Sequence, residues 1–326
     1  MVLLMKRTFP ALALMAILLM ASFSLTSASN EKPIIVCTTT VLSSIVEELV
    51  GDDADVIVLV QPGICPAYYD IKPSDVYAVS KARVIFYHGF EYKMWLKDMI
   101  ESSGNRDVIL VKVSGNWNDL NGAKRYITTI AGNLSEIFAK DYMKKASSMI
   151  SELESIGEFI NEKAAELRVN EVKVVCMKWQ KSFVEFIGFN VTDSYGPPER
   201  ISAKRAAELE ELIKREGIAL VIDNLQSGTY FGAELSSKTG AIHVVLTNFP
   251  DAIPGTSSLV EMIKYNAEQL FNAVAEWRSI SHAKEEISYL RGEIENLKTK
   301  LLIFQGLSLV LAICVAIELY IMRRRR

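Results

Sequence analysis

The chain has 326 residues, enough for one large domain or two medium-sized domains that each bury an apolar core. Its 36 Lys and Arg residues are balanced by 39 Asp and Glu residues, and the formal net charge of −3 lacks the basic excess typical of nucleic-acid-binding proteins. Half of the residues are hydrophobic, and part of that content lies in two terminal segments.

The N-terminal segment has the features of a secretory signal. Lys6 and Arg7 precede an apolar run, and small residues follow that run. We therefore assign residues 1–28 to a signal peptide with cleavage near Ala28. An uncleaved membrane anchor is the alternative.

The first part of the body alternates short apolar strands with helices. Strands are expected over 32–40, 53–63, 83–89 and 107–113, with helices over 41–51 and 73–82. Strands separated by helices indicate a parallel sheet that is covered on both faces. We assign residues 32–140 to an N-terminal α/β lobe.

The same pattern restarts further along the chain. Strands are expected over 171–179, 218–224 and 241–249, with helices over 202–217 and 229–240. We therefore assign residues 171–276 to a second α/β lobe. Residues 141–168, between the lobes, are predicted to form one long, rigid linker helix. Ligands of such sheets bind beyond the C-terminal ends of the strands, so we expect a cleft between the lobes, with modest closure because a continuous helix resists bending.

The C-terminal segment predicts a stalk, a membrane span and a basic tail. Ile at 280, 287 and 294, with Ala or Leu three residues later, gives an a/d heptad pattern over 277–300. A lone helix packed on its own body is the alternative to a coiled-coil stalk that makes the protein oligomeric. Residues 301–322 form an apolar stretch about 33 Å long as a helix, which matches a bilayer core of about 30 Å. The four arginines at 323–326 favour a cytoplasmic tail, which leaves the body outside the cytoplasm.

Several motifs, in order, resemble the zinc/manganese class of solute-binding proteins of ABC importers. They are IIVCTTT, PSDVYAVSKARVIFYHG, WNDLNGAK, SAKRAAEL, IDNLQ and PGTSSLVEMIKYNAEQL, and together they cover about residues 33 to 276. The resemblance implies two lobes fixed by a rigid helix and a metal ion held between them by histidines and carboxylates. It also implies an ABC permease and its ATPase as partners.

The metal ligands that the resemblance implies are replaced in this chain. Ala67 and Gly115 stand at two histidine positions, and Met177 stands at a histidine or glutamate position. Thr247 or Asn248 takes the place of an aspartate. A zinc site of histidines and carboxylates is therefore not expected here.

Sulfur-bearing residues lie near the same positions. Cys37 ends the first strand, Cys65 precedes Ala67 by two residues, and Cys176 with Met177 ends the first strand of the second lobe. We expect all four to face the cleft. Because thiolates and thioethers favour soft ions, we predict a Cu(I) or Zn(II) site formed by Cys65 and Cys176 and completed by Met177, Cys37 or His88.

Several alternatives to this sulfur site remain open. Buried cysteines are often inert, and an exported protein can oxidise Cys65 with Cys37 or with Cys176. His88 is explained equally well as a hydrogen-bonded core residue. A non-metal solute is a further possibility, and its predicted contacts are Tyr68, Tyr69, Trp179, Asn224, Gln226 and Thr247.

No enzyme signature accompanies these residues. A cysteine nucleophile needs a nearby base and an oxyanion donor, and no local motif supplies them. The glycine and lysine spacing of a phosphate-binding loop is also missing. We therefore predict a non-enzymatic, membrane-tethered extracytoplasmic receptor of an ABC importer, with a stalked adhesin or sensor as the other interpretation.

Overall fold

The first α/β lobe is built on a four-stranded parallel sheet. A computed structural model describes residues 32–325, so the predicted signal peptide lies outside the described residues. The strand order is β2-β1-β3-β4, and every neighbouring pair is parallel. The strands are β1 (Ile34–Cys37), β2 (Asp55–Val58), β3 (Ala82–Tyr87) and β4 (Ile109–Lys112).

The second lobe repeats this arrangement with strand order β6-β5-β7-β8. Its strands are β5 (Lys173–Met177), β6 (Asn190–Tyr195), β7 (Leu220–Asn224) and β8 (Ile242–Leu246). The sequence analysis did not anticipate β6. Its residues, NVTDSY, lack an apolar run because β6 is an edge strand that is largely not buried.

Helices cover both faces of both sheets, as predicted. Helices α2, α3, α4 and α5 belong to the first lobe, and α7, α8 and α9 belong to the second. The helices are α2 (Thr40–Val50), α3 (Pro73–Lys81), α4 (Lys97–Ser103), α5 (Leu120–Phe138), α6 (Met143–Glu166), α7 (Lys181–Ile187), α8 (Ala203–Glu216), α9 (Tyr230–Thr239) and α10 (Leu259–Arg324). The predicted fold class, two α/β lobes with parallel sheets, is therefore confirmed.

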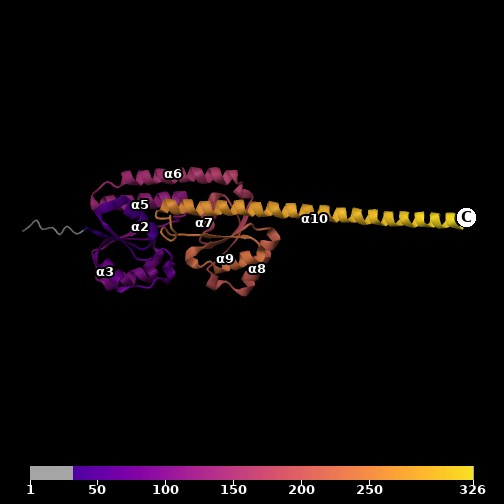
Figure 1. Cartoon of the computed structure of the whole chain (residues 1–326). Coiled ribbons are helices and arrows are strands. Elements are labelled where there is room, and N and C mark those ends of the chain that lie inside the picture. The colour runs from indigo at the N-terminus through magenta and orange to yellow at the C-terminus, as the bar shows by residue number, and fades with distance from the viewer. Residues whose placement is uncertain (1–31, 326) are drawn as a thin grey trace, which may run out of the picture.

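The predicted linker helix is α6, which lies along α5 and α10 (Figure 1). Gly157 in its middle allows close contact with α5. A Cβ atom at that position would lie 2.3 Å from Cδ1 of Leu120, too close for any other residue without a shift of Leu120. The glycine inside this helix thus has a packing reason.

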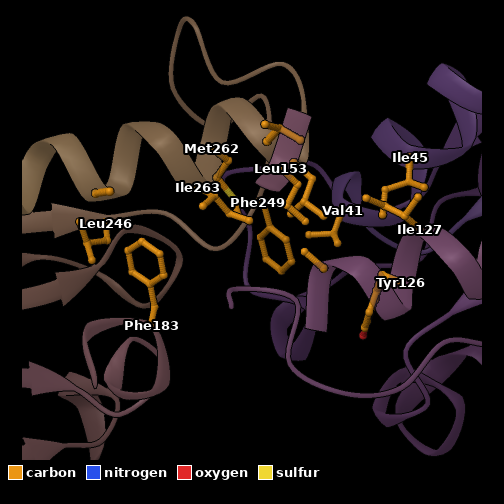
Figure 2. Close-up of a cluster of buried hydrophobic side chains, with 14 of the residues drawn as sticks. Val41, Ile45, Tyr126, Ile127, Leu153, Phe183, Leu246, Phe249, Met262 and Ile263 are labelled. Carbon is orange, nitrogen blue, oxygen red and sulfur yellow. The ribbon is translucent and has the colours of Figure 1, made fainter. Parts of the chain in front are cut away.

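A continuous apolar core joins the two lobes on the side of α6 and α10. It combines Leu153 of α6 with Val41 of α2 in the first lobe and Leu246 of β8 in the second (Figure 2). Met262 and Ile263 of α10 also enter it. The lobes are thus fixed to each other by α6, by the first turns of α10 and by this shared core. The sequence analysis predicted only the linker helix as the rigid connection.

Helix α10 unites the last helix of the second lobe, the predicted stalk and the predicted span in 66 continuous residues. Its buried residues end at Val274, and it then projects away from the lobes (Figure 1). Ile287 is 50% exposed and Leu290 is 47% exposed. The alternative that the stalk packs on its own body is therefore wrong.

The C-terminal part of α10 is strongly apolar. An 18-residue window within it has a mean hydropathy of 2.3, and no residue of that window is buried. By length and composition, α10 is the one helix of residues 32–325 that could cross a membrane.

A candidate site between the lobes

A cavity of about 570 Å³ lies between the facing edges of the two sheets. Six of the eight strands are followed by residues that line it. They include Cys65 after β2, Phe90 after β3, Trp117 after β4, Trp179 after β5, Asn224 at the end of β7 and Phe249 after β8. The cavity therefore lies beyond the C-terminal ends of the strands, where the sequence placed the cleft.

The positions implied by the family resemblance converge on this cavity. Ala67, Gly115 and Asn248 line it, whereas Met177 and Thr247 are fully buried beside it. The resemblance implies metal ligands at these three cavity positions. The side chains present are instead the methyl group of Ala67, the hydrogen atom of Gly115 and the neutral amide of Asn248. Within residues 32–325, no three His, Cys, Asp or Glu side chains are grouped so that they could hold a metal ion.

The expectation that all four sulfur atoms face the cleft is wrong for three of them. Cys65 lines the cavity, but Cys37 and Cys176 lie in the shared core and Met177 lies in a separate core on the other side of the second sheet. Successive side chains of a strand point to opposite faces, and helices cover both faces here. Residues inside β1 and β5 therefore point into cores rather than toward the strand ends.

The buried cysteines are also poorly suited to bind metal ions. Burial raises the pKa of the Cys37 thiol well above its usual range and that of Cys176 to about 12, so both stay protonated at neutral pH. All four cysteines of the described chain are free, so neither of the two disulfides considered above is present. Among the described residues, Cys65 is the one whose sulfur atom lines the cavity.

His88 is a buried, hydrogen-bonded residue behind the cavity wall. Its Nε2 lies 2.7 Å from Oγ1 of Thr39, and its Nδ1 lies 2.9 Å from the hydroxyl of Tyr126. Burial lowers the pKa of His88 to about 3, which keeps the ring neutral. Its ring stacks against Phe90 and packs against Trp117, so His88 supports two cavity residues and has no free nitrogen for a metal ion.

A buried carboxylate fixes the turn that carries Phe90. Glu91 accepts hydrogen bonds from Oγ1 of Thr38 at 2.7 Å and from the backbone N–H groups of His88 and Gly89. Burial raises the pKa of Glu91, and these donors oppose the rise. Every oxygen of this side chain is engaged inside the first lobe, so Glu91 supports the wall without facing a ligand.

An amide cluster connects the two lobes at the cavity. Oδ1 of Asn248 accepts from Nδ2 of Asn118 at 2.8 Å and from Nε2 of Gln180 at 3.0 Å. The indole N–H of Trp117 donates to the backbone carbonyl of Asn248 at 2.9 Å. Oδ1 of Asn118 and Oε1 of Gln180 are buried and have no hydrogen-bond partner among residues 32–325. Two acceptors are therefore left open at the junction of the lobes.

The segment that holds Asn118 is fixed against the start of α5. Asp119 caps the helix by accepting from the N–H of Gly122 at 2.7 Å, and Nδ2 of Asn116 donates to Asp119 and, across the lobes, to Oγ of Ser182. A Cβ atom at Gly122 would lie 1.5 Å from the carbonyl oxygen of Asn116. Only glycine permits this approach of backbone to helix.

Three of the six predicted ligand-binding residues, Trp179, Asn224 and Gln226, line the cavity. Thr247 is fully buried, and its hydroxyl accepts from Nε2 of Gln226 at 2.8 Å. Gln226 lines the cavity and also donates to the carbonyl of Pro62 in the first lobe at 2.9 Å. Thr247 thus orients a cavity amide and does not itself line the cavity.

The two tyrosines of the predicted binding loop lie outside the cavity. Tyr69 donates to Asp75 and packs on Trp95 within the first lobe. Tyr68 is exposed and donates its hydroxyl to Glu199 of the second lobe. This bond lowers the pKa of the Glu199 carboxyl. Tyr68 is therefore an inter-lobe contact rather than a cavity residue.

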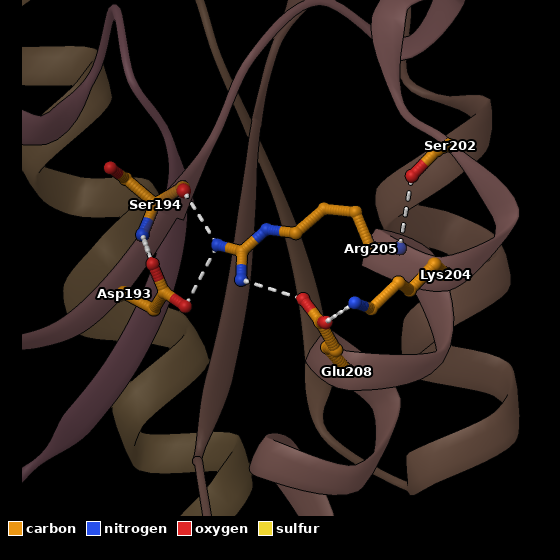
Figure 3. A network of polar contacts seen from close by, with 6 residues as sticks. All are labelled: Asp193, Ser194, Ser202, Lys204, Arg205 and Glu208. Atoms are coloured by element: carbon orange, nitrogen blue, oxygen red, sulfur yellow. Dashed lines mark hydrogen bonds and ion pairs between the residues drawn. The ribbon is translucent and has the colours of Figure 1, made fainter.

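A polar network anchors the loop that carries Glu199. Arg205 in the first turn of α8 donates to Asp193 at 2.8 Å and to the carbonyl of Ser194 at 3.2 Å, both at the end of β6 (Figure 3). Ser202 caps α8 by accepting from the N–H of Arg205. The two ends of the loop 196–201 are thereby held together.

Several cavity residues were missed by the sequence analysis. They are Phe90, Asn116, Trp117, Asn118 and Phe249. Four of them follow a predicted strand within a few residues, and Phe249 is the last residue of one, so an aromatic or amide side chain at the end of a strand is the signal that could have found them. The search for sulfur and histidine ligands passed over these neutral residues.

The model of one protein family covers most of the chain. The family is described as zinc-uptake complex component A, periplasmic (ZnuA), and its model matches residues 35–273. The chain belongs to this family. It is a family of substrate-binding transport components, so the chain is not an enzyme, as the sequence predicted.

Individual relatives agree with this assignment. The manganese-binding lipoprotein MntA of Halalkalibacterium halodurans is 22% identical over 77% of this chain and 91% of its own length. An uncharacterized protein of Rickettsia prowazekii is 29% identical over 72% of this chain and 80% of its own. The periplasmic zinc-binding protein TroA from Treponema pallidum has the same fold, with a TM-score of 0.64, 18% identity and coverage of 74% and 99% of the two chains. The resemblance inferred from the motifs is confirmed.

Proposed function

We propose that the chain is the extracytoplasmic solute-binding component of an ABC importer and that it captures its cargo in the inter-lobe cavity. The observation that carries this proposal is the cavity of about 570 Å³ formed by loops from both lobes. Its size falls within the roughly 300–1,000 Å³ of small-molecule sites. Family membership supplies the transport context.

Capture would involve a small change in the angle between the lobes. The shared core resists separation on the side of α6 and α10. At the rim of the cavity the lobes meet through exposed hydrogen bonds, such as Asn116 to Ser182 at 2.9 Å and Tyr68 to Glu199. Such bonds between exposed groups exchange readily with bonds to water, so they can open and close as cargo enters and leaves.

The C-terminal helix would tether the receptor beside its permease. Residues 301–322 span the membrane in this proposal, and the arginines at 323–326 remain in the cytoplasm. Several relatives, MntA among them, are named lipoproteins, and this agrees with a receptor attached to a membrane. The permease and its ATPase would lie in the same membrane.

A metal ion is the cargo that the names of the relatives favour. MntA is named for manganese and TroA for zinc. In this cavity the donors would be the thiol of Cys65 and amide oxygens such as those of Asn118 and Asn224. A thiol favours Cu(I) or Zn(II) over manganese. Of the five residues first predicted to form a metal site, only Cys65 lines the cavity and is kept in this proposal.

Transport-coupled activity tests the proposed function. The full chain is placed in liposomes with a permease and ATPase from the same gene neighbourhood, and ATP hydrolysis is measured with and without a metal and solute panel. We expect cargo-dependent stimulation that Ala67→Trp abolishes by filling the cavity. Lys144→Trp, on the exposed face of α6, is the matched control and should stimulate normally. Stimulation that survives Ala67→Trp would contradict capture in this cavity.

Metal binding is tested separately on reduced, purified protein. Thermal shifts with Cu(I), Zn(II) and Mn(II) are compared for the wild type, Cys65→Ser and Cys314→Ser, the last of which lies far along α10. If a soft ion is the cargo, only Cys65→Ser should lose the shift. Equal shifts in all three proteins would place the ion elsewhere.

A further inference from the structure

We infer that the cavity takes an uncharged planar heterocycle with N–H donors, such as a nucleobase or nucleoside, rather than a bare metal ion; this rests on the proposed function. Among the described residues that line the cavity, none carries a charge. A bare cation would therefore enter without a carboxylate or imidazole to compensate its lost hydration.

The walls of the cavity suit a flat ring. The first lobe contributes Phe90 and Trp117, and the second contributes Trp179 and Phe249. The rings of Trp117 and Phe249 are nearly parallel, with centroids 6.1 Å apart and an interplanar angle of 20°. Trp117 is held by its hydrogen bond to Asn248 and by contact with His88, so this wall is already ordered. Ordered aromatic walls favour ligands that stack.

The polar groups of the cavity indicate what the ring should carry. Oδ1 of Asn118 is buried without a partner, while Nδ2 of the same amide is already used by Asn248. The amide orientation is fixed by that bond, so the open atom is an acceptor. It is best satisfied by an N–H donor of the ligand. The amide of Asn224 gives one N–H to Gln226 and accepts one hydrogen bond from Ser227, so its second N–H and its second acceptor lone pair can pair with the edge of a nucleobase.

The lack of charge predicts discrimination between related ligands. We expect adenine, uracil and their nucleosides to bind, and the nucleoside monophosphates to bind far more weakly, because no Lys or Arg lines the cavity. Isothermal titration of the full chain in detergent measures both groups, together with Zn(II), Mn(II) and Cu(I).

Two variants and one control test the assignment. Asn118→Leu removes the open acceptor and should weaken nucleoside binding about tenfold. Trp179→Ala, at a half-exposed position where folding is little affected, should weaken stacking by a similar factor. Asn121→Leu lies on the exposed side of the same helix start and should bind as the wild type does.

The outcomes separate this inference from the proposed function. Saturable binding of a metal ion without binding of any base or nucleoside would overturn the inference and leave receptor function intact. Tight binding of the monophosphates, or unchanged affinity in Asn118→Leu, would also overturn it. Failure of all probes to bind, together with no stimulation of the transporter, would overturn both.

The stalk supports a second inference, which is independent of the cavity. We infer that residues 277–300 of α10 pair with a second copy of this chain as a parallel two-stranded coiled coil. The a positions are Ile280, Ile287 and Ile294, and the d positions after the first are Leu290 and Leu297. Ile at a with Leu at d favours two strands, and these side chains are exposed in the single chain.

Charges beside this seam favour the parallel orientation. The g positions Glu286 and Glu293 are acidic, and the e positions Lys284, Arg291 and Lys298 are basic. In a parallel, in-register pair, each g residue faces the e residue of the next heptad, which places Glu286 near Arg291 of the partner subunit and Glu293 near Lys298 of the partner subunit. Gly292 falls at an f position on the outer face, so it does not interrupt the seam.

Sedimentation of the full chain in detergent tests the pairing. We expect a dimer for the wild type and a monomer for Leu290→Asp, which places charge in the seam. Glu293→Lys should weaken the dimer by roughly two- to fivefold, and adding Lys298→Glu should restore it. Glu285→Lys, at an f position, is the matched control and should leave the dimer unchanged. A monomeric or trimeric wild type, or no rescue by the double exchange, would overturn the pairing.

Discussion

Two buried polar clusters lie close together in this molecule, and they differ in how completely they are satisfied. Around His88, both ring nitrogens have partners, and the nearby carboxylate of Glu91 accepts three hydrogen bonds. Around Asn118, two amide oxygens are buried without any partner. The histidine cluster lies within the first lobe, whereas the amide cluster joins Asn118 of the first lobe to Gln180 and Asn248 of the second.

The difference separates a supporting cluster from a binding one. Leaving a buried acceptor unpaired costs about 1–3 kcal/mol, so a fold keeps such a group where something else satisfies it. The histidine cluster needs nothing further and holds the wall in place. The amide cluster needs a donor, which a ligand can provide.

The largest expected effect concerns the core that holds both clusters. Leu153 of α6 is fully buried where the two lobes share their core. Leu153→Ala should lower the free energy of unfolding by about 2–5 kcal/mol because it leaves a cavity in a packed region. Urea unfolding measures this loss. A decrease in the free energy of unfolding of less than about 1 kcal/mol would show that packing around Leu153 does not stabilise the two lobes together.

Gly122 tests whether the amide cluster depends on one close backbone approach. Gly122→Ala places a methyl group against the carbonyl of Asn116, and we expect a loss of about 1–3 kcal/mol together with weaker ligand binding. Gly132→Ala, in the same helix with open space around it, should instead be neutral or stabilise by up to about 1 kcal/mol. Equal effects of the two changes would contradict the role of Gly122.

Acid sensitivity tests the histidine cluster. Burial lowers the pKa of His88 to about 3 in the fold, while the imidazole of the unfolded chain takes up its proton near the ordinary pKa of 6.5. Stability is therefore fully present above that value and falls as the pH decreases toward about 3, by about 2 kcal/mol near pH 5.

The matched variant for this test is His88→Gln, which keeps hydrogen-bonding capacity but cannot take up a proton. Urea unfolding near pH 7 and near pH 5 should show a smaller acid loss in the variant than in the wild type. His243 and His282 are present in both proteins, so their effects cancel. Identical pH profiles would mean that His88 is not held neutral.

The smallest expected effect is at the rim. Tyr68→Phe removes the exposed bond to Glu199, and the free energy of unfolding should be almost unchanged because water replaces that bond. Cargo release, followed by stopped-flow fluorescence, should nevertheless become faster because one inter-lobe contact is lost. An unchanged release rate would show that the contact does not hold the lobes closed.

The sequence by itself determined the alternation of strands and helices in both lobes and the place of the cleft. Short β-branched runs alternating with amphipathic helices permit only parallel sheets covered on both faces. The heptad of Ile and Leu residues and the apolar segment after it are local patterns, so α10 could be anticipated from its residues alone. The replacement of family ligands at Ala67 and Gly115 was also visible without a structure.

Only the tertiary structure decided which side chains reach the cavity. Cys176 and Met177 end a strand and were expected at the cleft, yet helices cover both faces of that sheet and bury both residues. Trp179, two residues further on, is past the strand and reaches the cavity. The unpaired oxygen of Asn118 likewise depends on Asn248, which is 130 residues away in the chain. Such contacts arise from packing between lobes, which no local pattern of residues encodes.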